Sequence, residues 1–278
     1  MKSQLEKARD LFALHAGPDI FVIPNPWDKG SARLLALAGF KALATSSAGF
    51  AFTLGRPDNA VGRDLMMSHL SAIADATDLP VSADLENGFG DSPKDAAETI
   101  RRAAQAGVVG GSIEDATGDP DVPLYPIALA AERIRAAAEA ARSLAFPFAL
   151  TARAENYLVG HAHLADTIKR LQAYQDAGAD VLYAPGLTSL EEIAAVVRAV
   201  DRPVNVLAGS QLTVGDLASV GVRRVSVGGS LARAAFGGFL SAVREISEHG
   251  SFNYSTAAIS HKEINLRFAT ASTRFGET

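Results

Sequence analysis

The chain has 278 residues and a mass of 29.0 kDa, and its 48% hydrophobic and 21% charged residues support a sizeable core and exclude disordered and fibrous classes. Its 26 Lys and Arg against 31 Asp and Glu give a formal net charge of −5, and no basic stripe gathers along the chain, so nucleic acid is not expected as a partner. The absence of cysteine excludes disulfides, thiolate metal sites and a cysteine nucleophile, and it fits a reducing compartment.

The N-terminal segment over residues 1–17 alternates charged and apolar residues at helical spacing. It therefore lacks the uninterrupted apolar core of a signal peptide. No later segment approaches 18 apolar residues without a charge. These features predict a cytoplasmic protein with no membrane partner.

Short β-rich apolar runs recur along the chain, each followed by a longer stretch of helical period. The runs are FVIPN (21–25), KALATSS (41–47), LPVSADLE (79–86), VVGGSIED (108–115), PFALTARAE (147–155), DVLYAPG (180–186), PVNVLAG (203–209) and RVSVGGS (224–230). Alternating β and α units predict parallel strands with right-handed crossovers, and eight of them close a (β/α)8 TIM barrel. An open doubly wound sheet is the alternative architecture.

The intervening stretches are rich in Ala, Leu, Glu and Arg, and several end at glycine, as helices do. The clearest are residues 92–107, 128–142, 164–178 and 189–200. No Gly, Ser or Pro-rich linker interrupts the series, so residues 1–250 are expected to form a single barrel domain. Residues 251–278 lie outside the eight-fold pattern and are expected to form a helix or a subunit contact. Together with the apolar segment 232–246, this extension predicts a homo-oligomer.

Polar residues gather where three consecutive predicted strands end, and the chemistry of a βα barrel sits on those loops. They are Asp84, Glu86, Glu114, Asp115, Arg153 and Glu155. The spacing of Asp84 and Glu86 would place both on one side of a strand. An all-oxygen set without cysteine suits Mg²⁺ or Mn²⁺ better than zinc. The alternative is that the acids cap helices or pair with basic residues, and it is favoured for Asp115.

The remaining polar groups of this rim suit a negatively charged substrate. Arg153 ends an otherwise apolar strand, where it can hold a carboxylate or phosphonate in a bidentate fork or stabilise an oxyanion. Its alternative role is a salt bridge to Glu155. Ser46, Ser47 and Ala48 combine small side chains with accessible backbone N–H groups, which suits an anion nest, although such strings also form plain turns.

Other glycines and histidines carry weaker signals. Residues 228–230 (Gly-Gly-Ser) can cradle a phosphate, but tight strand-to-helix packing explains them equally well. His161 and His163 are expected at the surface, and His15 and His69 fall on expected helices with no chemical role. The glycine strings lack the spacing of nucleotide-binding motifs.

Several motifs in order resemble the isocitrate lyase and phosphoenolpyruvate mutase superfamily. They are NPWDKGSARLLALAGFKALATSSAG (25–49), LGRPD (54–58), SADLENGFGDSP (82–93), GSIEDA (111–116), TARAENYL (151–158) and PVNVLAG (203–209). The resemblance covers roughly residues 20 to 247. It implies a βα barrel whose C-terminal helix is exchanged between subunits of a dimer or tetramer. It also implies Mg²⁺ and chemistry on small α-keto or α-hydroxy acids, or on phosphonates, through an enolate of pyruvate type.

The resemblance also implies roles for individual positions. The residues that it places in the metal shell are Asp58, Asp84, Glu86 and Glu114, of which Asp58 rests on the resemblance alone. The residues that it places on the substrate are Ser46, Ser47, Ala48 and Arg153, with Ser47 and Arg153 as the catalytic pair.

The chain departs from the family pattern at two places. Lyases that cleave isocitrate or methylisocitrate carry a Lys-Lys-Cys-Gly-His loop, whereas residues 116–126 read ATGDPDVPLYP. Pro185 stands where those lyases have a catalytic acid on the sixth strand. The loop also lacks the lysine and asparagine of a phosphonate mutase. Without a cysteine to protonate the departing enolate, efficient isocitrate cleavage is not expected.

The sequence thus predicts a Mg²⁺-dependent lyase, with Mn²⁺ as a substitute, that acts on a small α-keto or α-hydroxy carboxylic acid. C–C bond cleavage or decarboxylation of an oxaloacetate-like acid is the first choice, because it needs an electron sink but no specialised loop acid. Two alternatives stay open. One is phosphonate (P–C bond) chemistry of phosphoenolpyruvate mutase type, and the other is a non-catalytic keto-acid binding protein.

Overall fold

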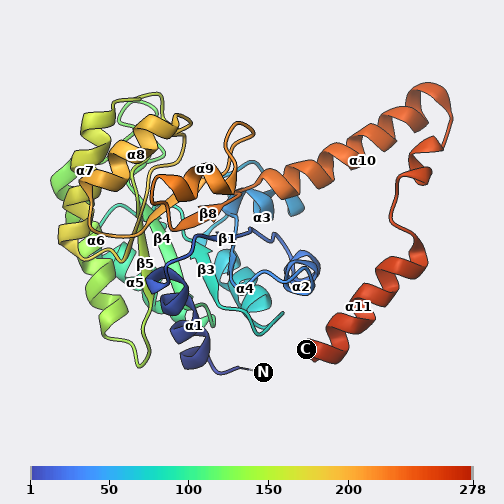
Figure 1. Ribbon diagram of the computed structural model, residues 1–278, viewed down its shortest axis with the longest axis horizontal. Coiled ribbons are helices and arrows are strands. Elements are labelled where there is room, and N and C mark those ends of the chain that lie inside the picture. Colours follow the sequence, from blue (N-terminus) through green and yellow to red (C-terminus); the bar gives the residue numbers. More distant parts are fainter. Residues whose placement is uncertain (1, 277–278) are drawn as a thin grey trace.

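Eight parallel strands form the centre of the computed structural model, which describes residues 2–276 (Figure 1). The strands are β1 (Phe21–Ile23), β2 (Leu43–Ala44), β3 (Val81–Asp84), β4 (Gly110–Glu114), β5 (Ala149–Arg153), β6 (Val181–Tyr183), β7 (Val204–Leu207) and β8 (Arg224–Ser226). Each lies inside one of the eight predicted apolar runs. The sequence prediction of the strands is therefore confirmed, with each strand shorter than its run.

The strands follow the order β1-β8-β7-β6-β5-β4-β3-β2, so the first and last strands pair and the sheet curls into a barrel. At the remaining seam the Ala44 N–H donates to the Pro24 carbonyl at 3.0 Å. Asn25 sits at the mouth end of this seam: its amide donates to the Thr45 carbonyl at 2.8 Å, and its Oδ1 accepts from Gly228 N–H at 2.9 Å. The fold is thus a (β/α)8 TIM barrel, and the doubly wound alternative is wrong.

Helices alternate with the strands as the sequence pattern predicted. They are α1 (Gln4–Ala16), α2 (Lys29–Leu37), α3 (Ser47–Thr53), α4 (Arg63–Ala74), α5 (Pro93–Gln105), α6 (Ile127–Arg142), α7 (Leu164–Ala177), α8 (Leu190–Ala199), α9 (Val214–Ser219), α10 (Ser230–His249), the 3₁₀ helix η1 (Asn253–Thr256) and α11 (His261–Phe275). Local signals set their ends: Ser92 and Asp95 form a capping box at the start of α5, and Gly178 ends α7 with φ of 108°.

Two apolar layers hold the barrel. The larger one packs the outward face of the strands against Ala-rich helix faces, where small side chains let helices α5 and α6 approach closely. A smaller cluster closes the amino ends of the strands, where Ala8 and Leu11 of α1 pack on Ile23, Val109 and Ala149. Because α1 seals this end, the opposite end, at the carboxyl termini of the strands, is left open for a site.

Helix α10 leaves the barrel as an arm, and the chain then returns through α11 (Figure 1). Only Ala232 of α10 is buried, whereas Phe239 is 62% and Leu240 56% exposed. Helix α11 packs on α2, where Phe275 joins the cluster of Ala36. The predicted extension over 251–278 thus holds a helix, and positions 277–278, like residue 1, lie outside the described residues. Within residues 2–276 no helix is long and apolar enough to cross a membrane.

Candidate active site at the carboxyl ends of the strands

A cavity of about 400 Å³ opens at the carboxyl ends of the strands. Side chains on a strand alternate between its two faces, so every second residue of each strand points into the barrel. On β3, β4 and β5 the last inward residues are Asp84, Glu114 and Arg153, which all line the cavity. The predicted gathering of these three side chains is confirmed.

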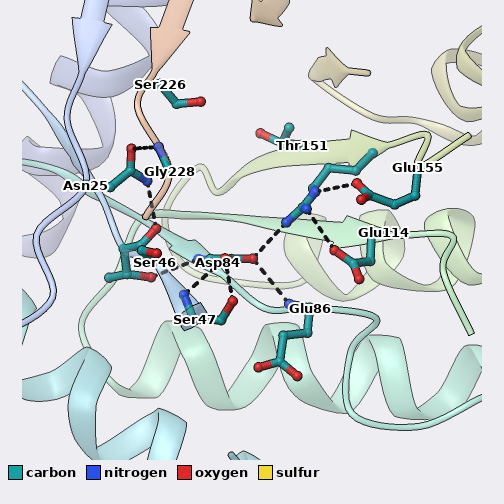
Figure 2. Close-up of polar contacts among 12 residues, drawn as sticks. Asn25, Ser46, Ser47, Asp84, Glu86, Glu114, Thr151, Glu155, Ser226 and Gly228 are labelled. Atoms are coloured by element: carbon teal, nitrogen blue, oxygen red, sulfur yellow. Dashed lines mark hydrogen bonds and ion pairs between the residues drawn. The ribbon is translucent and has the colours of Figure 1, made fainter. Parts of the chain in front are cut away.

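Arg153 is the centre of the polar cluster, and Figure 2 labels its three partners, Asp84, Glu114 and Glu155. Its Nη1 donates to Asp84 Oδ1 at 2.9 Å, its Nη2 lies 3.0 Å from Glu114 Oε2, and its Nε donates to Glu155 Oε1 at 2.9 Å. All four side chains are less than a fifth exposed. Burial raises the pKa of Glu114 and Glu155, and the nearby Arg153 charge opposes both shifts. The salt bridge to Glu155 that the sequence left as an alternative is therefore present, together with two further ones.

Asp84 also connects the arginine to the loop after β2. Its Oδ2 accepts from the Ser47 hydroxyl at 2.8 Å and from the Ser47 N–H at 3.1 Å. The Asp84 N–H in turn donates to Thr45 Oγ1 at 2.9 Å. These bonds fix the Asp84 carboxylate between Ser47 and Arg153, with both of its oxygens facing the cavity cluster.

Glu86 lies differently from the sequence expectation. Strand β3 ends at Asp84, and Glu86 adopts a left-handed backbone with φ of 49°, so strand alternation does not carry over to it. Its side chain lines a neighbouring cavity of about 780 Å³ rather than the one that Asp84 lines. The prediction that both acids share one strand face is thus wrong, although the Glu86 N–H still approaches Asp84 Oδ1 at 3.4 Å.

Glu86 nevertheless has a buried carboxyl group close to two other acids. Its Oε1 is buried and has no hydrogen-bond partner among the described residues. Burial, with the charges of Asp84 and Asp58, raises the pKa of Glu86 to about 8. Asp58 lies in an exposed loop, where its Oδ1 is 3.4 Å from Ser47 Oγ. Partial desolvation and the Asp84 charge raise the pKa of Asp58 as well.

The four acids that the sequence assigned to a metal lie around the same end of the barrel, but they are not arranged as direct ligands of one ion. Among residues 2–276, no three His, Asp or Glu side chains come together as direct ligands. Four carboxylates, one of them with an orphaned buried oxygen, still form an oxygen-only donor set of the kind that suits Mg²⁺. Since Mg²⁺ keeps several of its waters in proteins, the set fits an ion held mostly through water.

The predicted anion nest is the first turn of a helix. Ser46 is the N-cap of α3, and its hydroxyl accepts from the Gly49 N–H at 3.0 Å. Ser46, Ser47 and Ala48 all line the 400 Å³ cavity. The Ser47 N–H and hydroxyl are already bound to Asp84, so the Ser46 hydroxyl as donor, the Ala48 N–H and the helix dipole are the groups left to face an anion.

Asp115 has a structural role, as the alternative interpretation of its sequence position predicted. It is 2% exposed and points away from the cavity, where Arg170 Nη1 donates to its Oδ2 at 3.0 Å and the Tyr174 hydroxyl at 2.5 Å. Its Oδ1 accepts from the Glu155 N–H at 2.8 Å. Asp115 therefore positions the backbone beside Arg153. His163 is likewise structural, as the N-cap of α7.

Several residues of the cavity were not selected from the sequence. Asn25, Tyr183, Asn205 and Arg224 line it from strands β1, β6, β7 and β8 or their ends. The signal for the last three was available, because they occupy inward positions of their strands. Tyr183 pairs with Arg153, Asn205 with Tyr183, and Arg224 with Asn205, and because barrel strands are tilted this row of pairs does not stay at one depth in the barrel. Asn25 offered no such signal, because its role depends on the seam that it closes.

Residues 11–247 match the family model of phosphoenolpyruvate phosphomutase. An uncharacterised protein of Mycobacterium tuberculosis is 33% identical over 82% of this chain and 85% of its own length. A 2-methylisocitrate lyase of Bacillus subtilis is 32% identical over 68% of this chain and 63% of its own length. An oxaloacetate decarboxylase of Bradyrhizobium is 28% identical over 72% of this chain and 70% of its own length.

Solved structures show the same similarity. A candidate lyase/mutase of Burkholderia cenocepacia J2315 is 60% identical, with a TM-score of 0.94 over 96% of this chain and 97% of that one. Oxaloacetate acetylhydrolase in complex with oxalate is 26% identical, with a TM-score of 0.85 over 98% and 96% of the two chains. Phosphonopyruvate hydrolase in complex with oxalate and Mg²⁺ is 26% identical, with a TM-score of 0.83 over 98% and 99%.

Proposed function

Since the chain belongs to the phosphoenolpyruvate mutase family, whose wider superfamily includes isocitrate lyases, we propose that it is a Mg²⁺-dependent lyase for a small α-keto or α-hydroxy carboxylic acid. The reaction that we favour is C–C cleavage or decarboxylation of an oxaloacetate-like substrate. The name of the oxaloacetate decarboxylase relative supports this choice.

One observation carries the proposal: Ser47, Asp84, Arg153 and Glu114 are bonded into a single buried cluster at the carboxyl end of the barrel. Burying several carboxylates together costs free energy unless cations neutralise them. Arg153 supplies one positive charge, and the orphaned Glu86 oxygen supports a further cation at the site. The cluster thus suits a cation as well as an anionic substrate.

In this proposal Asp58, Asp84, Glu86 and Glu114 would hold Mg²⁺, mostly through water, and the chemistry supplied there would be Lewis-acid polarisation of the keto oxygen. Mn²⁺ can replace it, because it shares the preference for oxygen ligands.

The chain's own residues bind and orient the substrate. The Ser46–Ala48 turn anchors its carboxylate through hydroxyl and backbone N–H groups at the start of α3. Arg153 stabilises negative charge as it develops on the substrate oxygens, and Ser47 holds Asp84 in place for this step. In a decarboxylation the electron pair of the broken C–C bond forms the enolate of the keto acid, carbon dioxide leaves, and solvent water then protonates the enolate carbon. That step needs no proton from a loop residue, which fits a loop over 116–126 without cysteine or lysine.

We also propose that residues 1–250 form the catalytic domain and that α10, with the segment 251–278, contacts a second copy of the chain. The apolar face of α10 that its own barrel leaves uncovered, with Phe239 and Leu240, supports a homodimer or tetramer in which this helix is exchanged.

A second candidate is P–C bond chemistry on a phosphonate such as phosphonopyruvate. It is favoured by the similarity to phosphonopyruvate hydrolase over nearly the whole of both chains. A third is keto-acid binding without turnover, which the absence of the lyase loop residues would allow.

The test is ¹H and ³¹P NMR of the purified protein with Mg²⁺ against oxaloacetate, methylisocitrate, isocitrate, phosphonopyruvate and 2-ketoglutarate, each repeated with EDTA. Metal-dependent pyruvate from oxaloacetate would support the proposal, with the Asp84→Asn variant and spontaneous decarboxylation as controls. Phosphate release from phosphonopyruvate would select the second candidate. Thermal stabilisation by keto acids without any turnover would select the third.

A further inference from the structure

A second arginine lies at the floor of the same cavity. Arg224, on β8, is 5% exposed and lines the 400 Å³ cavity. Its Nη2 donates to Thr151 Oγ1 at 3.0 Å, so the two side chains meet in one layer of the barrel interior. Arg153 follows Thr151 by two residues on β5, which puts it about 6.6 Å nearer the mouth at roughly 3.3 Å per residue. The cavity therefore contains one arginine near its mouth and one at its floor.

Every hydrogen-bond partner of Arg224 is neutral. Its Nε donates to Asn205 Oδ1 at 2.8 Å, and its Nη1 lies 3.4 Å from His15 Nε2. The other ring nitrogen of His15 is 2.9 Å from the Leu11 carbonyl, so Nδ1 carries the proton and Nε2 accepts. Burial, with the Arg224 charge beside it, lowers the pKa of His15 to about 3, which keeps the ring uncharged.

Arg224 thus differs from Arg153 in its charge balance. Arg153 contacts three carboxylates, whereas no carboxylate within residues 2–276 forms an ion pair with Arg224. Its three contacts also leave two of the five guanidinium N–H groups without a partner among the residues that the structure describes. A buried cation without a counter-charge is costly, and this burial lowers the pKa of Arg224 to about 10.

The barrel interior above Arg224 is hollow because its side chains are short. The inward positions of a TIM barrel are usually filled by Val, Ile and Leu. Here β3, β4 and β5 place Ser82, Ser112 and Thr151 there, and β8 adds Ser226; Thr151 and Ser226 project inward in Figure 2. Ser82, Ser112 and Ser226 line the cavity, so a polar shaft connects its mouth to its floor.

We propose that the floor of the barrel binds a single small carboxylate, held by Arg224 with help from the neighbouring hydroxyl and amide groups. The two unused N–H groups can pair with two carboxylate oxygens, as guanidinium forks do. The carboxylate has two sources. One is the far end of a dicarboxylic keto acid, a reading that rests on the proposed function, and the other is a free monocarboxylate.

The test is thermal denaturation of the full-length protein in EDTA with sodium formate, at constant ionic strength set by sodium chloride, which carries no carboxylate. Wild type should gain about 3–5 °C at ten times the dissociation constant of formate. Arg224→Met should lose this gain. Arg223→Met is the matched control, because Arg223 directly precedes Arg224 and carries the same charge. Its side chain donates to the Pro18 carbonyl outside the barrel.

A second variant keeps the test decisive if Arg224→Met fails to fold. Ser112→Leu retains the arginine and fills the shaft, so it should also abolish the formate response. An equal response in wild type and in Arg224→Met, or no response in wild type, would overturn the proposal.

Kinetics then identify the source of the carboxylate. If the floor receives the far end of the substrate, formate inhibits oxaloacetate turnover competitively, and Arg224→Met raises KM for oxaloacetate more than it lowers kcat. If the floor holds a separate carboxylate, formate leaves KM unchanged. Should oxaloacetate not be turned over at all, the proposed function fails while the denaturation experiment still decides on the site.

Discussion

Replacing Arg153 with methionine tests whether the buried cluster is held by one guanidinium. The substitution keeps an unbranched side chain but leaves Asp84, Glu114 and Glu155 without the cation that lies within 3.0 Å of each. Removing one partner from a buried ion pair costs about 3–5 kcal/mol. For a chain of this size that lowers Tm by about 6–20 °C, at roughly 2–4 °C per kcal/mol.

The pH dependence of the defect has a definite sign. Burial raises the pKa of Glu114 and Glu155, and without Arg153 no guanidinium opposes these shifts, so the folded variant binds more protons than the unfolded chain above about pH 4. Its stability relative to wild type therefore falls as pH rises, and the defect is smallest near pH 4–5, where the acids are protonated.

Guanidinium chloride unfolding in EDTA at pH 5 and pH 8 measures both effects. Arg101→Met is the control, because Arg101 is half exposed, lies 3.5 Å from Glu98 and should change stability by less than about 0.5 kcal/mol. An Arg153→Met protein as stable as wild type at pH 8 would refute the idea that this guanidinium neutralises the cluster.

Three further predictions concern other residues. Asp84→Asn should lower metal-dependent kcat at least roughly 100-fold with the fold intact by circular dichroism, and undiminished turnover in that variant would contradict its role. His15 has its folded pKa lowered from 6.5 to about 3, so the unfolded chain binds the extra proton and stability should fall by about 2–3 kcal/mol from pH 7.5 to pH 4.5. Urea titrations should show a smaller loss in His15→Gln, and an identical loss would exclude His15 as the cause. Phe239→Asp on the exposed face of α10 should reduce the oligomer to a smaller species by analytical ultracentrifugation, whereas a monomeric wild type would contradict an α10 interface.

The fold was predictable because a parallel barrel repeats one simple pattern. Each strand is buried on both faces, so it appears as an apolar run, and each helix shows a 3.6-residue period. The ends of strands were less predictable: the run over 41–47 yields a strand of only two residues, Leu43–Ala44, because Ser46 caps a helix there. The course of α10 away from the barrel could not be predicted from its composition. The composition indicates only that the apolar face of this helix packs against another part of the protein or another copy of it.

The site was predictable wherever strand alternation holds and was mispredicted where it ends. Asp84, Glu114 and Arg153 are inward residues of regular strands, and they meet as expected. Glu86 follows the end of its strand, and its left-handed backbone sends the side chain into a neighbouring cavity. For Asp115, the deciding partner, Arg170, lies on a helix that sequence spacing does not connect to it.

The charges of the cavity explain how an acidic cluster can receive an acidic substrate. Asp58, Asp84, Glu114 and Glu155 place four acidic groups near the mouth, and Arg153 pairs with the last three. A keto acid entering this cluster without another cation would be repelled, since charges interact strongly in a poorly hydrated site. In the proposed function a divalent ion at the acids would reverse the local field, and Arg224 would draw the far end of a dicarboxylic substrate inward. Metal and keto acid would then favour each other's binding, and this coupling would be reciprocal by thermodynamic linkage.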